Sequence, residues 1–344
     1  MSFRANVVSV GIFIKSRLPR PFGTRNDNTI FPLILAILLY ILIYFLRLQQ
    51  GGWDIKLDLF KSQREYLDKQ IQIYLPSPQA ELLSGILLGQ NKNLPGSLKL
   101  ALRDTSTLHI VVASGQNLTI VAGFFLSLAG LIKRRTALIL SLGVCIFYTL
   151  LSGMQIPILR AAIMFGFSSL AQFVGRPREG WWVLIVTAGL MLLINPVWIT
   201  SLSFQLSFLA TFGVIVVSPI FKRSFSRLPI LGEDLAVTLG AQLMVVPVIA
   251  QNFHQISLVS LATNILILWT IPFIMVLGAL MLIINWFSIL VNSLLTYITY
   301  IVYFFASMPF AWEYVGEQVW IVWVGYYMLV AGIMLSLKNV QKNN

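Results

Sequence analysis

Long apolar runs, separated by short polar connections, set the pattern of the whole chain. A bilayer core about 30 Å thick takes roughly 20 apolar residues for each helical crossing, and most runs approach or exceed that length. The pattern predicts an all-α polytopic membrane protein with about ten transmembrane helices. The runs are residues 30–46, 108–132, 136–152, 155–174, 181–194, 201–218, 235–251, 258–284, 287–308 and 319–337.

Composition agrees with a membrane location and excludes some chemistries. Of the 344 residues 58% are hydrophobic and 10% are charged, far from the balance of a soluble globular domain. Cys145 is the single cysteine, so the chain forms neither an internal disulfide nor a cysteine-based metal site. With His109 and His254 as the two histidines, we expect no histidine-rich metal centre and no cofactor.

The basic residues of the connections alternate along the chain and predict its orientation. Lys and Arg in short loops stay on the cytoplasmic side. With the N-terminus inside, 15 of the 24 Lys and Arg residues fall in cytoplasmic segments, whereas the short loops assigned outside contain none. Both termini are therefore expected in the cytoplasm. The outside loops are SGMQIP, NPVWITS, QNFHQIS and AWEYVGEQ.

Five parts follow from this reading. They are a basic cytoplasmic tail at 1–29, a first transmembrane helix at 30–47, a small extracytoplasmic segment at 48–107, a transmembrane bundle at 108–337 and a second cytoplasmic tail at 338–344. In the extracytoplasmic segment we expect amphipathic helices near 79–90 and 95–105. For the N-terminal stretch, a short amphipathic anchor on the membrane surface is the alternative.

Polar side chains inside the apolar runs are the candidate functional residues, because lipid offers them no partners. In TLHIVVASGQNLTIVAGFF, Gln116 and Asn117 are successive amides that cannot face one neighbour on a helix, and Gly115 weakens the helix beside them. A local break or a water-lined wall is favoured at Ser114–Asn117, with helix packing as the alternative.

Arg160 lies about eight residues inside a run, and no acidic residue stands within any crossing core to pair with it. Backbone carbonyls, amides, water or an anionic ligand are its expected partners, and a phosphate suits its planar fork of donors. The alternative is a structural arginine that caps an unwound helix end. Gln205 with Ser207, and Asn264 ahead of Pro272, add further polar groups at depth. Run 258–284 is longer than a simple crossing, so a tilt, a kink and a re-entrant half-helix all stay open as its arrangement.

Four segments in succession resemble the ComEC family of competence proteins. They lie within residues 81–275 and read ELLSGILLGQNKNLPGSLKLALRDTSTLHIVVASGQNLTIVAG, SGMQIPILRAAIM, NPVWITSLSFQLSFLATFG and VVPVIAQNFHQISLVSLATNILIL. The resemblance implies an inner-membrane channel component that conducts single-stranded DNA into the cytoplasm during natural transformation. Gln116 and Asn117 stand where family members commonly have Leu-His, which keeps hydrogen bonding but removes a titratable group.

The same resemblance gives the expected site and partners. No residue is assigned a catalytic role. The expected lining of the DNA pathway is His109, Ser114, Gly115, Gln116, Asn117, Arg160, Gln205, Ser207 and Asn264. Full-length family members usually carry an extracytoplasmic oligonucleotide-binding barrel and a metallo-β-lactamase-like nuclease domain. Here the outer segment is short for a barrel and no His-x-His-x-Asp-His signature occurs, so we expect the membrane domain alone, without enzymatic activity.

The expected partners are single-stranded DNA, the lipid bilayer, an extracytoplasmic DNA receptor, a separate nuclease and a cytoplasmic DNA-translocating ATPase; assembly of several copies is left open. Two other functions compete with the channel. One is a transporter of a small or lipid-like solute. The other, less favoured, is an intramembrane hydrolase using Ser114 with His109, since residues five apart on a helix lie about 140° off one face and no carboxylate orients the imidazole.

Overall fold

The computed structural model describes residues 30–51, 58–90, 93–112, 114–127, 130, 132–175, 179–225 and 231–343. The tail predicted for 1–29 lies outside the described residues, as do Arg176, Arg178 and Arg227, which contribute to the charge alternation.

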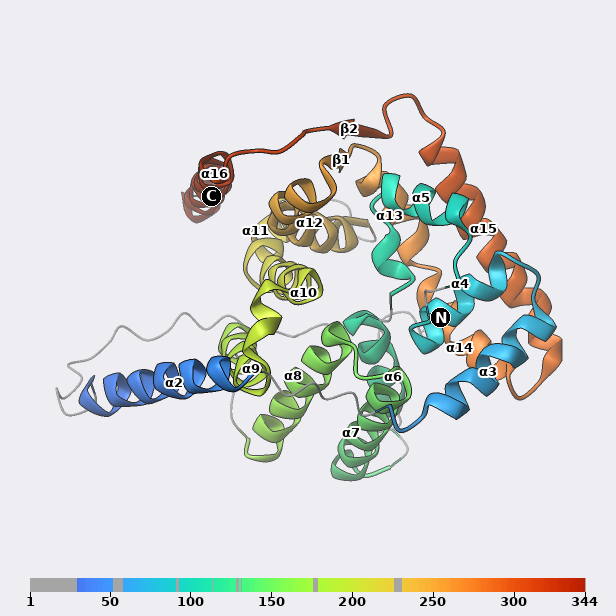
Figure 1. The fold of residues 1–344 in the computed structure, drawn as a ribbon, viewed down its shortest axis with the longest axis horizontal. Coiled ribbons are helices and arrows are strands. Elements are labelled where there is room, and N and C mark those ends of the chain that lie inside the picture. The colour runs from blue at the N-terminus through green and yellow to red at the C-terminus, as the bar shows by residue number, and fades with distance from the viewer. Residues whose placement is uncertain are drawn as a thin grey trace.

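Helices account for most of the described chain, and one or more lies in each predicted run (Figure 1). They are α2 (Ile30–Gln50), α3 (Lys61–Tyr74), α4 (Gln79–Leu88), α5 (Gly96–Asp104), α6 (Gly115–Ser127), α7 (Arg134–Leu151), α8 (Ile156–Phe173), α9 (Gly180–Ile194), α10 (Leu202–Phe212), α11 (Ser218–Ser224), α12 (Leu231–Phe253), α13 (Ser260–Leu268), α14 (Ile271–Met281), α15 (Ser288–Ala306) and α16 (Trp320–Asn343). Short 3₁₀ helices are η2 (Leu108–Ile110), η4 (Pro196–Thr200) and η6 (Asn285–Phe287), and a π-helical turn, η5 (Gly213–Val217), joins α10 to α11.

Six helical segments of the described chain are long and apolar enough to cross a membrane, or seven if the bent pair α13–α14 forms one span. This agrees with an all-α multi-pass membrane protein, while the number of ten crossings stays a prediction. α13 and α14 meet at 45°, and Pro272 stands in the first turn of α14, where its missing N–H costs no helical bond. Of the three arrangements left open for 258–284, the bend excludes a straight tilted helix and agrees with a kinked span or a re-entrant half-helix.

The buried core is centred on α4. Eight of its ten residues are buried, and it packs against α3, α14 and α15. A Cβ on Gly278 of α14 would stand 2.9 Å from Leu83 and 3.0 Å from Leu87, so α14 lies directly on α4. A helix was expected near 79–90, but the expectation that it is amphipathic is wrong, because neighbouring helices enclose it. α5, in contrast, buries one face through Leu98, Ala101 and Leu102.

α3 is attached to the turn between α7 and α8 through Arg64. The Arg64 guanidinium pairs with Asp58 and lies on Gly153, which has a φ of +77°. A Cβ on Gly153 would stand 2.3 Å from Arg64 Nη1. Burial lowers the pKa of Arg64 and the adjacent Glu65 opposes that shift. On the same turn, Gln155 Nε2 donates to the Gly89 carbonyl at 2.8 Å, which joins α8 to the end of α4.

We expect Gly153→Ala to lower the free energy of unfolding by about 1 to 2 kcal/mol, because a side chain at this positive φ is strained and also displaces Arg64. Thermal unfolding of the detergent-solubilised chain measures the change. Gly143→Ala is the matched control, since a Cβ at this position of α7 meets nothing within 4 Å, and it should leave stability equal or slightly raised. Equal behaviour of the two variants would contradict the role of the Arg64 contact.

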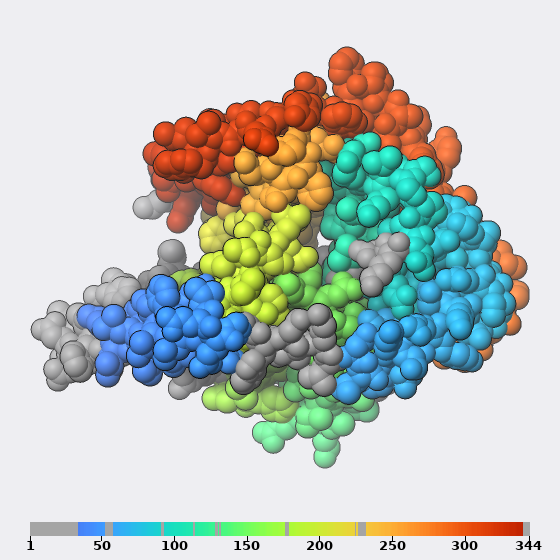
Figure 2. All heavy atoms as spheres, in the orientation of Figure 1, coloured from blue at the N-terminus to red at the C-terminus, as the bar shows by residue number. Residues whose placement is uncertain are grey.

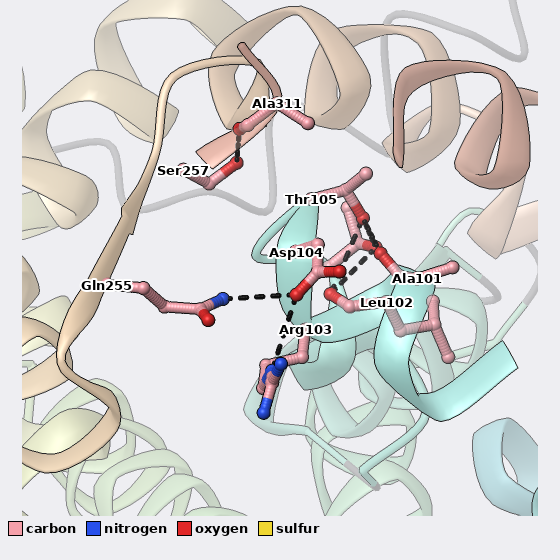
Figure 3. A network of polar contacts seen from close by, with 9 residues as sticks. Ala101, Leu102, Arg103, Asp104, Thr105, Gln255, Ser257 and Ala311 are labelled. Atoms are coloured by element: carbon pink, nitrogen blue, oxygen red, sulfur yellow. Dashed lines mark hydrogen bonds and ion pairs between the residues drawn. The ribbon is translucent and has the colours of Figure 1, made fainter. Parts of the chain in front are cut away.

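Three of the loops predicted outside contact the 48–107 segment or one another, namely SGMQIP, QNFHQIS and AWEYVGEQ. Strands β1 (Gln255–Ser257) and β2 (Trp312–Tyr314) pair antiparallel and so join two of these loops. Gln255 Nε2 donates to Asp104 of α5 at 3.2 Å, and Ser257 Oγ donates to the Ala311 carbonyl at 3.3 Å (Figure 3). The grouping agrees with the charge alternation, while the side of the membrane that this face takes stays a prediction.

Two helices stand at the edge of the bundle. α2 protrudes from α9, and α16 follows the extended segment that contains β2 (Figures 1 and 2). Tyr40 of α2 donates to the Gly189 carbonyl at 3.2 Å, and Tyr326 and Tyr327 of α16 each donate to a carbonyl of α12 at 2.9 Å. The remaining apolar surface of both helices is exposed and suits contact with lipid.

Candidate functional site

The Ser114–Asn117 stretch forms the N-terminus of α6. η2 ends at Ile110, and α6 starts at Gly115, so the predicted break in the helix is confirmed. Ser114 Oγ accepts a hydrogen bond from the Asn117 backbone N–H at 3.4 Å, as a helix-capping serine does. The two adjacent amides take different environments: Gln116 is exposed and Asn117 is buried.

Asn117 connects α6 to the core helix α4. Its Nδ2 donates to the Ile86 carbonyl at 2.9 Å, and its Oδ1 accepts from Ser114 Oγ at 3.0 Å. Both ends of the Asn117 amide thus help to hold the start of α6 against α4. Asn117 is therefore a helix-packing residue, which was the alternative given for this stretch. Gln116, in contrast, reaches an exposed surface.

Asn117→Leu should lower the free energy of unfolding by about 1 kcal/mol, the size of a side-chain hydrogen bond between membrane helices, because the Ile86 carbonyl loses its donor. Gln116→Leu is the matched control one residue earlier, and its exposed side chain predicts a change near zero. Thermal unfolding in detergent compares the two. A larger loss for Gln116→Leu would show that the amides are assigned the wrong roles.

Arg160 of α8 lies between α6 and α10. Its Nη1 donates to the Ser207 carbonyl of α10, and its Nη2 lies 2.6 Å from the position that a Cβ on Gly115 would take. Ala161 also approaches this position, at 3.1 Å. Glycine at 115 leaves room for the guanidinium in this position, and a larger residue would displace it. We call Ser114, Gly115, Asn117, Arg160 and Ser207 the Arg160 cluster.

The electrostatics of the Arg160 cluster favour an anion. The guanidinium stands at the N-terminus of α6, where the helix dipole contributes a partial positive charge. Among the described residues no carboxylate forms an ion pair with Arg160. Two positive features therefore converge without a counter-charge from the described part of the chain. A negatively charged group would stabilise this arrangement.

Three of the nine predicted residues also carry a buried polar atom without a hydrogen-bond partner in the described chain: Arg160 Nε, Ser207 Oγ and Asn264 Oδ1. Buried polar atoms are nearly always paired in folded proteins, so each such atom calls for a ligand, a water molecule or a strained contact.

Gln205 and His109 have hydrogen-bond partners outside the Arg160 cluster. Gln205 Nε2 donates to the Ile199 carbonyl at 3.0 Å, within its own segment. His109 is exposed in η2, where its Nδ1 lies 3.0 Å from the Ser106 carbonyl. His109 and Ser114 thus have separate partners, and within the described part of the chain no hydrogen bond joins them as a hydrolase pair would require. Asn264 is buried on α13.

Sequence reasoning missed two features that hold the site. Gln155, which fixes α8 to α4, stands inside the SGMQIPILRAAIM segment but gives no signal beyond being polar next to a turn. The Ile86 carbonyl is a backbone group and has no sequence signal at all. The residues that the structure describes contain no group of three or more His, Cys, Asp or Glu side chains that could hold a metal ion.

The fold and this cluster define a multi-pass α-helical membrane protein in which an arginine without a carboxylate partner among the described residues, together with amide groups, lies against a broken helix. Residues 86–340 match the model of the family described as Competence protein, which is more than half of the chain. The chain belongs to this family, and the resemblance to ComEC is confirmed.

Three relatives illustrate the similarity. The uncharacterized protein YcaI of Escherichia coli is 30% identical over 228 residues, ComE operon protein 3 of Bacillus subtilis is 28% identical over 214, and an uncharacterized protein of Aquifex aeolicus is 28% identical over 218. Each match covers 62% of this chain and, respectively, 30%, 27% and 51% of the relative. The chain thus corresponds to about half of these relatives or less. No solved structure matches it.

Proposed function

We propose that this chain is a component of an inner-membrane channel that conducts single-stranded DNA into the cytoplasm during natural transformation. Membership of the competence family supports a role in DNA uptake, and the similarity to a protein of the ComE operon agrees with it. The observation that carries the proposal is Arg160, an arginine inside an apolar bundle that lies against a helix N-terminus and has no carboxylate partner in the described chain.

A conduit for a single strand needs donors for the repeating phosphate and faces for the bases. It must also bind weakly at several points, because a deep trap would hold the polymer in place. Arg160 supplies one cationic donor, and Gln116, Gln205 and Asn264 add neutral amides at other depths of the bundle. Such sparse, mostly neutral donors suit passage better than tight binding.

In this proposal the other steps of uptake belong to partners. The segment 48–107 carries seven basic residues from Lys56 to Arg103 against six acidic residues from Asp54 to Asp104, so its surface attracts DNA only weakly. An extracytoplasmic receptor would deliver the strand, a separate nuclease would remove its complement and a cytoplasmic ATPase would pull it inward.

Uptake of labelled DNA tests the proposal directly. Competent cells that lack the corresponding gene are complemented with this chain, and internalised, nuclease-resistant label is measured beside label bound at the surface. Restored internalisation is expected. If the complemented cells stay without uptake while the chain is present in the membrane, or if the purified chain in vesicles moves a small solute and never DNA, the transporter reading replaces the channel.

Binding of single-stranded DNA to the purified chain should weaken as salt rises. Each phosphate contact releases bound counterions, which gives a slope of about −0.7 in log affinity against log salt for a single strand. Because the chain offers few cationic donors, we expect a shallow slope that corresponds to one phosphate contact or a few. Fluorescence anisotropy of a labelled oligonucleotide measures it, and a flat response would mean that phosphate is not what the chain recognises.

A further inference from the structure

An apolar groove of about 490 Å³ lies between α3 and α7, away from the Arg160 cluster. Phe60, Tyr66 and Leu67 form one wall, and Phe147 and Leu151 form the other. The rings of Phe60 and Phe147 pack edge to face with centroids 5.5 Å apart and so join the two walls. The proposed DNA channel makes no use of this groove.

The wall contributed by α7 continues from a lipid-facing surface. α7 is one of the helices long and apolar enough to cross a membrane, and the groove lies at its C-terminal end, where Leu151 is the last residue. Ile146 and Phe147 are each 51% exposed on this helix. The groove is therefore open to the region where acyl chains meet α7. If water filled the groove, its apolar lining would stay hydrated, at a free-energy cost of about 25 cal/mol per Å² relative to contact with an acyl chain.

The wall contributed by α3 has the pattern of a helix at a membrane surface. Leu59, Tyr66 and Ile73, spaced seven residues apart, are 61%, 62% and 70% exposed, so a sparse apolar stripe, interrupted by polar residues, runs along the helix and its N-terminal approach. Lys61 and Glu65, which form an ion pair at 3.9 Å, flank the stripe on the exposed surface. An apolar stripe beside charged residues is typical of helices that lie in the lipid interface.

We propose that α3 lies in the interfacial layer of the membrane and that the groove between α3 and α7 binds an acyl chain of a phospholipid, with its head group beside Lys61. The continuity with the exposed face of α7 and the apolar stripe of α3 both favour lipid over a protein partner. The bound lipid would also hold Arg64 of α3 on the turn before α8. This proposal does not depend on DNA as the cargo.

Photo-crosslinking tests the site in the full chain. The protein is placed in nanodiscs that contain a phospholipid with a diazirine in one acyl chain, and the modified residues are mapped by mass spectrometry. We expect adducts within 60–67 and within 147–151 at a level above that of the exposed faces of α2 and α16. Adducts confined to those other lipid-facing helices would overturn the proposal.

Two variants on one helix make the test specific. Gln63→Trp places a large ring in the groove and should reduce adducts at 147–151 several-fold, whereas Gln72→Trp lies nine residues further along, on the opposite face of α3, and should leave them unchanged. Equal labelling in both variants would contradict a bound chain. A free fatty acid with the same diazirine forms a second arm, and stronger labelling by it than by the phospholipid would exclude a phospholipid as the occupant.

Discussion

Arg160→Ala is expected to reduce internalisation of DNA by about tenfold or more while DNA bound at the cell surface persists. Losing a charged hydrogen-bonding group from a buried site costs about 1.5 to 3 kcal/mol of interaction, and each 1.4 kcal/mol corresponds to a factor of ten. The effect should be large because, within the described chain, Arg160 is the cation placed against the N-terminus of α6. The complementation assay for labelled DNA measures it.

Three controls separate a pathway role for Arg160 from a structural one. Arg160→Lys keeps the charge but loses the planar fork, so it should retain part of the uptake. Arg134→Ala removes an exposed arginine that donates to Gln172 at 3.2 Å, and it should leave uptake unchanged. Thermal unfolding must show that Arg160→Ala is folded. Normal uptake by a folded Arg160→Ala would remove this residue from the DNA pathway and support its reading as a helix cap.

Gly213→Ala is expected to lower the free energy of unfolding by about 3 kcal/mol or more. A Cβ at this position would stand 2.1 Å from the Gly240 carbonyl oxygen, and a Cβ on Gly240 would stand 2.9 Å from that of Gly213. The π-helical turn η5 and α12 therefore cross with their backbones in contact. Overpacking of this kind usually costs about 1 to 3 kcal/mol, and here a rigid backbone rather than a flexible side chain must move.

The matched control for this crossing is Gly166→Ala in α8, where a Cβ meets nothing within 4 Å. It should leave the unfolding temperature equal or slightly raised, because alanine favours the helix over glycine. Both variants are compared by thermal unfolding in the same detergent. If Gly213→Ala were as stable as Gly166→Ala, the close crossing of η5 with α12 would be wrong.

Part of the site could be predicted from the sequence because it is local. Ser114-Gly115-Gln116-Asn117 combines a capping serine, a helix-weakening glycine and two amides, and a helix starts there. Pro272 marks the first turn of α14 for the same kind of reason. The contact of Gly115 with Arg160 and that of Arg160 with Ser207 join segments 45 or more residues apart, and neither spacing nor composition predicts them.

The membrane explains which features the sequence by itself determined. A bilayer requires apolar runs of fixed length with their backbone hydrogen bonds satisfied internally, so the runs predicted where most of the helices lie. The helices α3, α4 and α5 fall outside these runs, and α3 was not predicted. Lipid and protein interior are equally apolar, however, so an apolar residue carries no sign of which of the two it faces. Only the tertiary structure decided that α4 lies at the core, that Asn117 binds the Ile86 carbonyl and that Gly213 meets Gly240, because these contacts depend on shape and close approach rather than on hydrophobicity.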